Sequence, residues 1–245
     1  MSQHGKKALV VGVGAERGLG SALAMRFAAE GHQVFVAGRT MEKLQHVSSL
    51  IRSRGGVATP VQCDATDESS VVSLFDAVQS DGQGVLDLVV YNAGNSMPGN
   101  IREMQADYFT RSWNVLCFGG FLVGREVCRR MLPGGGTLLY TGASASLRGK
   151  AGFAAFNSGK AALRTMVQAM AKEYAAEGLH VGHVIIDGGI AGQRQFDRLG
   201  AEPDDKDLER FICLQSLTDA YWMLYRQKPT GWTFELDLRT ALENW

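Results

Sequence analysis

Segments typical of β-strands alternate along this chain with segments that have the apolar spacing of helices. The predicted strands cover residues 7–13, 34–37, 57–63, 86–91, 137–141, 180–186 and 232–238. The stretches between them show the three- and four-residue apolar spacing of helices that bury one face. Strict alternation predicts an α/β fold, in which a doubly wound parallel sheet of about seven strands has helices on both faces.

The chain shows no sign of a division into several domains. Its 245 residues suit one domain with a sizeable core, and no repeat or linker interrupts the pattern. The longest helical stretches are predicted near residues 106–131 and 153–177, on either side of the fifth strand. We therefore predict a single domain over residues 1–245.

One segment departs from the alternation. Residues 190–216 are polar, charged and weakly patterned, and they follow the carboxyl end of a predicted strand. Ligands bind at the carboxyl ends of the strands in open parallel sheets. We expect a mobile lid or substrate loop here, and an ordinary surface excursion is the alternative.

Charge balance and cysteine spacing narrow the possible functions. Lysine plus arginine equals aspartate plus glutamate at 25 each, so no positive excess favours nucleic acid or an acidic membrane surface as a partner. No apolar run approaches the roughly 20 residues that span a bilayer, and the N-terminus does not resemble a signal peptide. The cysteines stand too far apart for a metal motif or a disulfide framework. We expect a cytoplasmic protein with no bound metal.

A glycine-rich turn follows the first predicted strand. It reads Gly-Ala-Glu-Arg-Gly-Leu-Gly and contains Gly14, Gly18, Leu19 and Gly20. Glycine lets the backbone approach a phosphate closely, and the N-terminus of the following helix offers free N–H groups. A plain tight turn would use similar residues. The position on the first strand–helix unit favours a nucleotide-binding site.

Further motifs follow the later strands in a recognisable order. They are Asp64-Ala65, Asn92-Ala93-Gly94 and, four residues after Phe156, Lys160. Together with the glycine turn they resemble the short-chain dehydrogenase/reductase family over nearly the whole chain, from residue 6 to about 187. The resemblance implies a Rossmann-type fold, a nicotinamide nucleotide as cofactor, and a small-molecule carbonyl or alcohol as substrate.

The resemblance also assigns roles in nucleotide binding. It implies that Asp64 and Ala65 contact the adenine. It implies that Asn92, Ala93 and Gly94 shape the ribose pocket, although Tyr91 precedes them where the family more often has asparagine. Lys160 is expected to bind the nicotinamide ribose as well. After the sixth strand, Gly188 and Ile190 are expected near the nicotinamide, and Asp187 stands where the family usually has proline.

The residues after the second strand indicate which nucleotide is preferred. An acidic residue there would hold the ribose 2′-hydroxyl of NAD. This chain has Gly38-Arg39-Thr40 instead. The Arg39 guanidinium can pair with a 2′-phosphate, and Arg17 in the glycine turn can approach the same group. We predict NADP(H) rather than NAD(H), and two solvated surface arginines are the alternative.

The candidate catalytic residues match the family only in part. By resemblance, Lys160 lowers the pKa of the proton donor, and Asn114 anchors a water that links this lysine to solvent. The substrate-binding serine should lie at Ala143, and Ser144 is its nearest substitute. The proton donor itself, a tyrosine in the family, is replaced by Phe156, which has no exchangeable proton.

Three hypotheses remain open for the function. The first is an NADP(H)-dependent oxidoreductase with nonstandard proton transfer, in which a water on the Lys160–Asn114 network or Ser144 supplies the proton. The second is a non-redox enzyme, and the third is a catalytically silent protein that binds nucleotide. For any of them the resemblance implies a homotetramer or homodimer formed through the two long helices.

Overall fold

The computed structural model describes residues 5–82, 84–96 and 98–243. Their central element is a seven-stranded sheet in which every neighbouring pair of strands is parallel. In the order in which they lie, the strands are β3 (Val57–Gln62), β2 (Gln33–Gly38), β1 (Lys6–Val11), β4 (Val85–Tyr91), β5 (Gly136–Thr141), β6 (Leu179–Ile186) and β9 (Glu235–Leu238). The predicted doubly wound parallel sheet is therefore confirmed.

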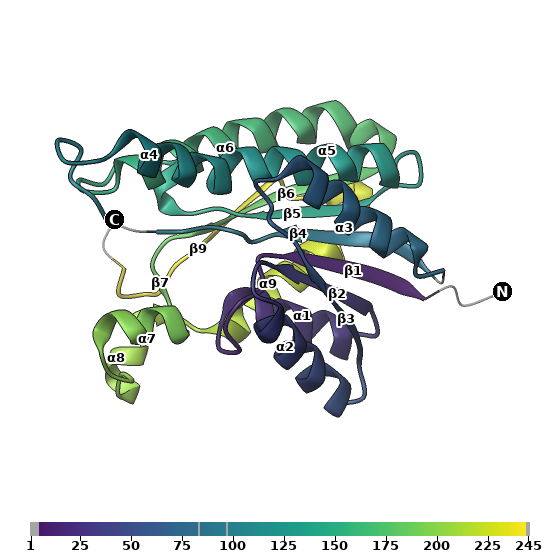
Figure 1. Cartoon of the computed structure of the whole chain (residues 1–245), viewed down its shortest axis with the longest axis horizontal. Coiled ribbons are helices and arrows are strands. Elements are labelled where there is room, and N and C mark those ends of the chain that lie inside the picture. The colour runs from purple at the N-terminus through teal and green to yellow at the C-terminus, as the bar shows by residue number, and fades with distance from the viewer. Residues whose placement is uncertain (1–4, 83, 97, 244–245) are drawn as a thin grey trace.

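Helices cover both faces of this sheet (Figure 1). One face carries α1 (Leu19–Ala29), α2 (Met41–Ser53) and α9 (Leu214–Tyr225). The other carries α3 (Glu68–Ser80), α4 (Ala106–Trp113), α5 (Gly119–Met131) and α6 (Ala154–Tyr174). The strand order reverses between β1 and β4, and this switch point is where open α/β sheets bind ligands.

Alternating side chains of the central strands build two separate cores. In β1, Ala8 and Val10 join the core under α1 and α2, while Leu9 and Val11 join the core under α3, α5 and α6. This alternation follows from the two-residue repeat of a strand. Because both faces are buried, the middle of the sheet is a rigid platform for the loops at its carboxyl edge.

The helix predicted over residues 106–131 is interrupted in the structure. A π-helical turn, Asn114–Phe118, separates α4 from α5. Beside it, the hydroxyl of buried Tyr91 donates a 2.6 Å hydrogen bond to the carbonyl of Val115. A Cβ atom on Gly119 would lie only 2.5 Å from that hydroxyl, so this glycine makes room for the tyrosine. Such π-turns occur frequently at functional sites.

The segment predicted as a lid, residues 190–216, has more structure than its sequence suggested. It contains α7 (Gln193–Leu199) and α8 (Asp205–Leu208), and it continues into α9. At its base, β7 (Gly189–Ile190) pairs in parallel with β8 (Phe211–Ile212). Figure 1 shows α7 and α8 as a separate lobe at the side of the sheet. We refer to residues 190–216 as the lid segment.

The described residues contain neither a membrane-spanning helix nor a cluster of metal-ligating side chains. None of the described helices is both long and apolar enough to cross a membrane. In the same part of the chain, no group of three or more histidine, cysteine, aspartate or glutamate side chains is arranged to hold a metal ion.

Candidate active site

The glycine-rich turn packs directly against the loop that follows β4. Gly12 has a φ of +99°, and a Cβ atom there would clash with the backbone of Ala93. A Cβ atom on Gly20 would lie 2.6 Å from the carbonyl oxygen of Gly12. Gly12 was missed in the sequence, because only the three-dimensional packing shows that it must be glycine.

The same turn leaves open space at the helix N-terminus. Gly18 is the N-cap residue of α1, and Leu19 is buried as the first helical residue. A Cβ atom on Gly14 would meet nothing within 4 Å. Free backbone N–H groups at the start of α1 thus border an accessible space, which is the arrangement that binds phosphate.

Asn92 connects the ends of three strands. Its side-chain amide donates a 3.0 Å hydrogen bond to the carbonyl of Gly12, after β1. Its side-chain oxygen accepts a 3.0 Å bond from the hydroxyl of Thr141, at the end of β5. Asn92 therefore fixes the relative positions of the loops at the switch point. This structural role comes in addition to the predicted role in shaping the ribose pocket.

Lys160 lies in the interior, with only 5% of its surface exposed. Its ammonium group donates a 2.5 Å hydrogen bond to the carbonyl of Thr141. A Cβ atom on Gly94 would lie 3.9 Å from this ammonium, so the Asn92–Gly94 loop and Lys160 are neighbours. Burial lowers the pKa of Lys160 from 10.5 to about 8.

Asn114 is the first residue of the π-turn between α4 and α5. Its carbonyl accepts from Gly119 N, and its side chain is half-buried. Within the described residues its amide makes no hydrogen bond to another side chain or to the backbone. The amide is thus free to hold a water molecule.

Ser144 and Asp187 form a polar cluster at the ends of β5 and β6. The buried Asp187 carboxylate accepts bonds of 2.8 and 2.9 Å from Arg148, and the Ser144 hydroxyl adds to the groups that lower its pKa. Burial raises the pKa of Asp187, but these hydrogen bonds outweigh it and leave the pKa below its ordinary value. Ser144 thus helps to keep this carboxylate ionised.

Phe156 lies half-buried on α6, one helical turn before Lys160. Ala143, the other substitution noted in the sequence, is buried and is the N-cap residue of the short turn Ser144–Ser146. Neither side chain has an exchangeable proton. Any proton donor must therefore be another group, such as Lys160 or Ser144.

The two arginines predicted to read the 2′-phosphate have different surroundings. Arg39 follows β2 and is exposed, and among the described residues its guanidinium makes no hydrogen bond or ion pair. Arg17 instead lies over the ring of Phe196 and pairs with Glu202 at 2.6 Å, both in the lid segment. Thr40 is the N-cap residue of α2, and its side chain makes no capping hydrogen bond. The structure therefore leaves Arg39 free and attaches Arg17 to the lid segment.

The remaining predicted nucleotide contacts lie at the carboxyl edge as well. Asp64 accepts hydrogen bonds of 2.9 and 2.8 Å from Thr66, which shape the loop after β3. Ala65 is buried against Gly119. Gly188 has a φ of +149°, and Ile190 belongs to β7 at the base of the lid segment.

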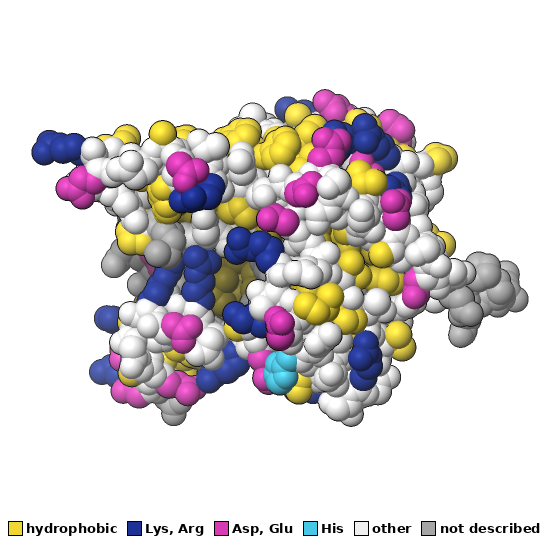
Figure 2. Space-filling model, in the orientation of Figure 1, with side chains coloured by type: hydrophobic (Ala, Val, Ile, Leu, Met, Phe, Trp, Pro, Cys, Tyr) yellow, Lys and Arg dark blue, Asp and Glu magenta, His cyan; other side chains and the backbone are white. Residues whose placement is uncertain are grey.

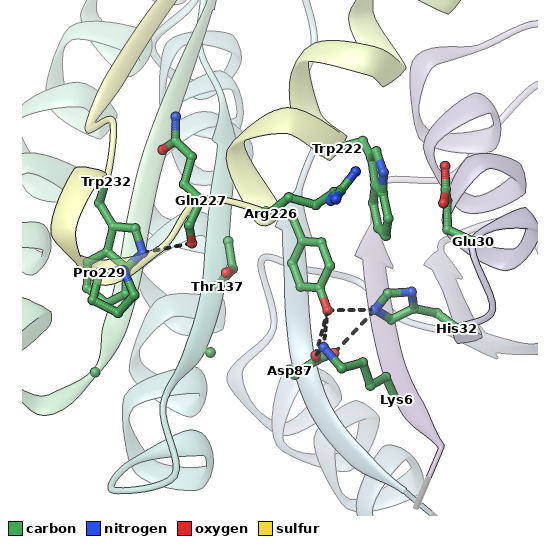
Figure 3. Close-up of a pocket in the computed structure, with 13 residues that line it drawn as sticks. Lys6, Glu30, His32, Asp87, Thr137, Trp222, Arg226, Gln227, Pro229 and Trp232 are labelled. Carbon is green, nitrogen blue, oxygen red and sulfur yellow. Dashed lines mark hydrogen bonds and ion pairs between the residues drawn. The ribbon is translucent and has the colours of Figure 1, made fainter. Parts of the chain in front are cut away.

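A pocket of about 510 Å³ lies at the opposite edge of the sheet, at the amino ends of the strands. Its lining includes Lys6, Asp87 and Tyr225, whose polar groups hydrogen-bond to one another (Figure 3). Ligands of parallel sheets bind at the carboxyl ends. We therefore assign this pocket no part in the candidate active site.

A parallel sheet with a glycine-rich turn and a helix N-terminus at its switch point defines a Rossmann-type nucleotide-binding protein. The family model for short chain dehydrogenases matches residues 6–194. The chain belongs to this family.

Relatives and solved structures agree with this assignment. The chain is similar to the versicolorin reductase stcU of Emericella nidulans, with 35% identity over 68% of this chain and 62% of that protein. It is 29% identical to the trihydroxynaphthalene reductase PfmaI of Pestalotiopsis fici, over 91% of this chain and 86% of the relative. The crystal structure of a short-chain dehydrogenase from Rhodopseudomonas palustris is 34% identical, with a TM-score of 0.82 over 96% of this chain and 99% of that one.

Proposed function

We propose that the protein is an NADP(H)-dependent oxidoreductase that interconverts a carbonyl and an alcohol on a small molecule, with Lys160 as the source of the proton. The observation that carries the proposal is the buried Lys160 ammonium, which is held by Thr141 beside the Asn92–Gly94 loop. Its pKa of about 8 lies near physiological pH. A group with such a pKa can hold and release a proton efficiently.

The residues present fit a nicotinamide nucleotide. The open space at Gly14 and the N-terminus of α1 would hold its phosphates, and the loop from Asn92 to Gly94 would border its ribose. When bound, this nucleotide supplies or accepts the hydride. The protein's own contribution is then to orient the substrate and to move a proton.

The proposed proton transfer differs from that of a family member with tyrosine at the position of Phe156. Lys160 has three N–H donors, and the Thr141 carbonyl occupies one of them. The other two can reach the substrate oxygen directly or through a water on the Asn114 amide. The Ser144 hydroxyl, at the start of the short turn after β5, would hydrogen-bond to the substrate oxygen.

We propose NADP(H) over NAD(H) because of Arg39. It stands at the end of β2, where an acidic residue would favour NAD, and its guanidinium is free in the described structure. A guanidinium matches a phosphate by two parallel hydrogen bonds. In this proposal Arg17 reaches the same phosphate only after it leaves Glu202.

A screen of carbonyl compounds tests the oxidoreductase proposal. Purified protein is mixed with NADPH and with aldehydes, aryl ketones or 1,2-diketones, and NADPH absorbance and product mass are followed together. The proposal expects one NADPH consumed for each alcohol formed. Conversion without NADPH consumption would contradict it.

The second candidate is a non-redox or catalytically silent protein that binds nucleotide. One observation favours it: Phe156, which stands where the family has its proton donor, has no exchangeable proton. Under this alternative, NADPH would bind, yet no carbonyl compound would be reduced. The same screen, combined with a binding titration, separates the two candidates.

We also propose that copies of the chain associate through the outer face of α4 and α5. Phe109, Trp113 and Phe121 on these helices are 38%, 36% and 40% exposed. Figure 2 shows hydrophobic side chains gathered over the helical layer at the top of the view. Association would bury them, as large exposed apolar patches commonly require. Sedimentation at the mass of one subunit would contradict this proposal.

A further inference from the structure

Two arginines of the lid segment reach over to the loop that follows β4. Arg194 on α7 approaches the carbonyl of Gly94 at 3.5 Å, and Arg198, one turn later, contacts the carbonyl of Ser96. These contacts join segments about 100 residues apart in the sequence. Figure 2 shows Lys and Arg side chains around the hollow between the lobe and the rest of the molecule.

These arginines lack the acidic partners that arginines usually have. Among the described residues, no carboxylate forms an ion pair with Arg194 or Arg198. Arg17, at the same junction, is by contrast paired with Glu202 at 2.6 Å. The nearby carboxylate of Asp197 is bonded to Gln193.

The surroundings of Arg194 are those of a group inside an open hollow. Its side chain is accessible to water, yet protein atoms surround enough of it to lower its pKa. The positive charge of Arg198 lowers the pKa further. Two guanidinium groups that repel each other, and that bind only carbonyl oxygens, would be stabilised by a shared negative charge.

We propose that Arg194 and Arg198 form an anion site, which holds a carboxylate or phosphate group of the ligand between the lid segment and the sheet. The bidentate geometry of guanidinium suits both kinds of oxyanion. The weak contact to the Gly94 carbonyl would give way to the charged ligand.

The position of the site relates it to the proposed reaction. Arg194 contacts the carbonyl of Gly94, and the Lys160 ammonium lies 3.9 Å from the position of a Cβ atom on the same glycine. An anion held by Arg194 is therefore near the proton source. This step rests on the proposed function, and it indicates a substrate with a carboxylate close to its carbonyl. The alternative source of the oxyanion is the nucleotide's own phosphate.

Binding measurements on matched variants test the site. The protein is titrated by calorimetry with NADPH, and its NADP⁺ complex is titrated with phenylglyoxylate or with the uncharged methyl ester of that acid. The variants are Arg194→Gln, Arg194→Lys and the double variant Arg194→Gln/Arg198→Gln. Arg54→Gln, which removes one exposed arginine near the end of α2, is the control for net charge.

We expect the double variant to weaken phenylglyoxylate binding at least about tenfold, since a charge-assisted hydrogen bond contributes on the order of that factor. Methyl ester and NADPH should bind as in the parent protein, and Arg194→Lys should retain part of the affinity. If only the affinity for NADPH fell, the anion site would instead be assigned to the nucleotide phosphate.

The site is overturned if neither affinity changes in the double variant, or if the control loses as much as the double variant. A different result would contradict the proposed function, namely that NADPH is consumed with none of the carbonyl compounds. Because the titrations need no turnover, the two failures can be told apart.

Discussion

The lysines at the two ends of the parallel sheet differ in their partners: one pairs with a carboxylate, and the other is buried without one. At the amino end, Lys6, Asp87 and Tyr225 are joined by contacts of 2.6, 2.8 and 2.9 Å, and the buried His32 lies beside them (Figure 3). At the carboxyl end, the buried Lys160 ammonium donates to a backbone carbonyl. Arg194 likewise contacts a carbonyl there.

We infer from this difference that the amino-end groups contribute to stability, whereas the cations at the carboxyl end contribute to ligand binding. At the amino end, the Lys6 ammonium has a carboxylate partner in Asp87. Burial of Lys160, in contrast, lowers its pKa from 10.5 to about 8, which corresponds to a cost of about 3 kcal/mol for the charged form. Cations that are costly to bury and that lack a carboxylate partner are typical of sites that act on a ligand.

The largest expected effect is at Lys160. Replacing it by Met should lower kcat/KM for carbonyl reduction by about 10²- to 10⁴-fold, since that is the range for a lost general acid. The variant should not melt at a lower temperature, because it removes a buried charge. Lys172→Met, at an exposed position of the same helix, is the control and should change neither quantity.

The difference in folding stability between the parent protein and Lys160→Met should depend on pH. The folded pKa of Lys160, about 8, lies below the 10.5 of the unfolded chain. The unfolded chain therefore binds more protons between these values, so the parent protein gains stability as pH rises through them. The stability advantage of Lys160→Met should be full below pH 8 and vanish above pH 10.5. A variant that is less stable at every pH would show a structural role for Lys160.

The next largest effect is expected at Arg39. Arg39→Ser should weaken NADPH binding about 10- to 100-fold and leave NADH binding unchanged, because a hydrogen bond between charged groups contributes about 1.5–3 kcal/mol. Calorimetric titration with both nucleotides measures this. Equal losses for the two nucleotides would show that Arg39 does not read the 2′-phosphate.

A smaller gain is expected from Phe156→Tyr. A tyrosine one turn before Lys160 would add a second proton donor, so the single-turnover rate of NADPH oxidation should stay the same or rise, by less than about 10²-fold. A fall in that rate, with folding intact by circular dichroism, would mean that the phenylalanine itself packs against the substrate.

Asp87→Asn should have its effect on stability alone. It leaves Lys6 without its carboxylate partner, and we expect unfolding free energy to fall by about 1–3 kcal/mol, while NADPH affinity stays constant. Burial raises the pKa of Asp87, but hydrogen bonds from His32, Lys6 and Tyr225 together outweigh burial and leave the pKa below its ordinary value. The contribution of the ionised Asp87 carboxylate to folding stability should therefore be lost as pH falls through that lowered pKa. A change in NADPH affinity would show that the amino end of the sheet also affects nucleotide binding.

The sequence predicted the fold because its signals are local. Each strand, the turn from Gly14 to Gly20 and the Asn92–Gly94 loop can be recognised from short runs of residues. The positions of the predicted site residues at one edge follow from a parallel sheet, in which all strands end on the same side.

The features that the sequence did not reveal depend on contacts between distant segments. Arg17 meets Glu202 across 185 positions, and Arg148 meets Asp187 across 39. The π-turn at Asn114 depends on a tyrosine hydroxyl from β4. No periodicity or short motif encodes such pairs, and so the lid contacts and the Arg148–Asp187 pair required the structure.

The central claim is that Lys160 delivers the proton, and its pH dependence tests this most directly. The single-turnover rate of NADPH oxidation is measured from pH 6 to 10 with a carbonyl compound found in the screen. An acid must be protonated to act, so the account predicts a rate that is constant at low pH and falls above an apparent pKa of about 8. A rate that is independent of pH across this range, or that rises above pH 8, would contradict it.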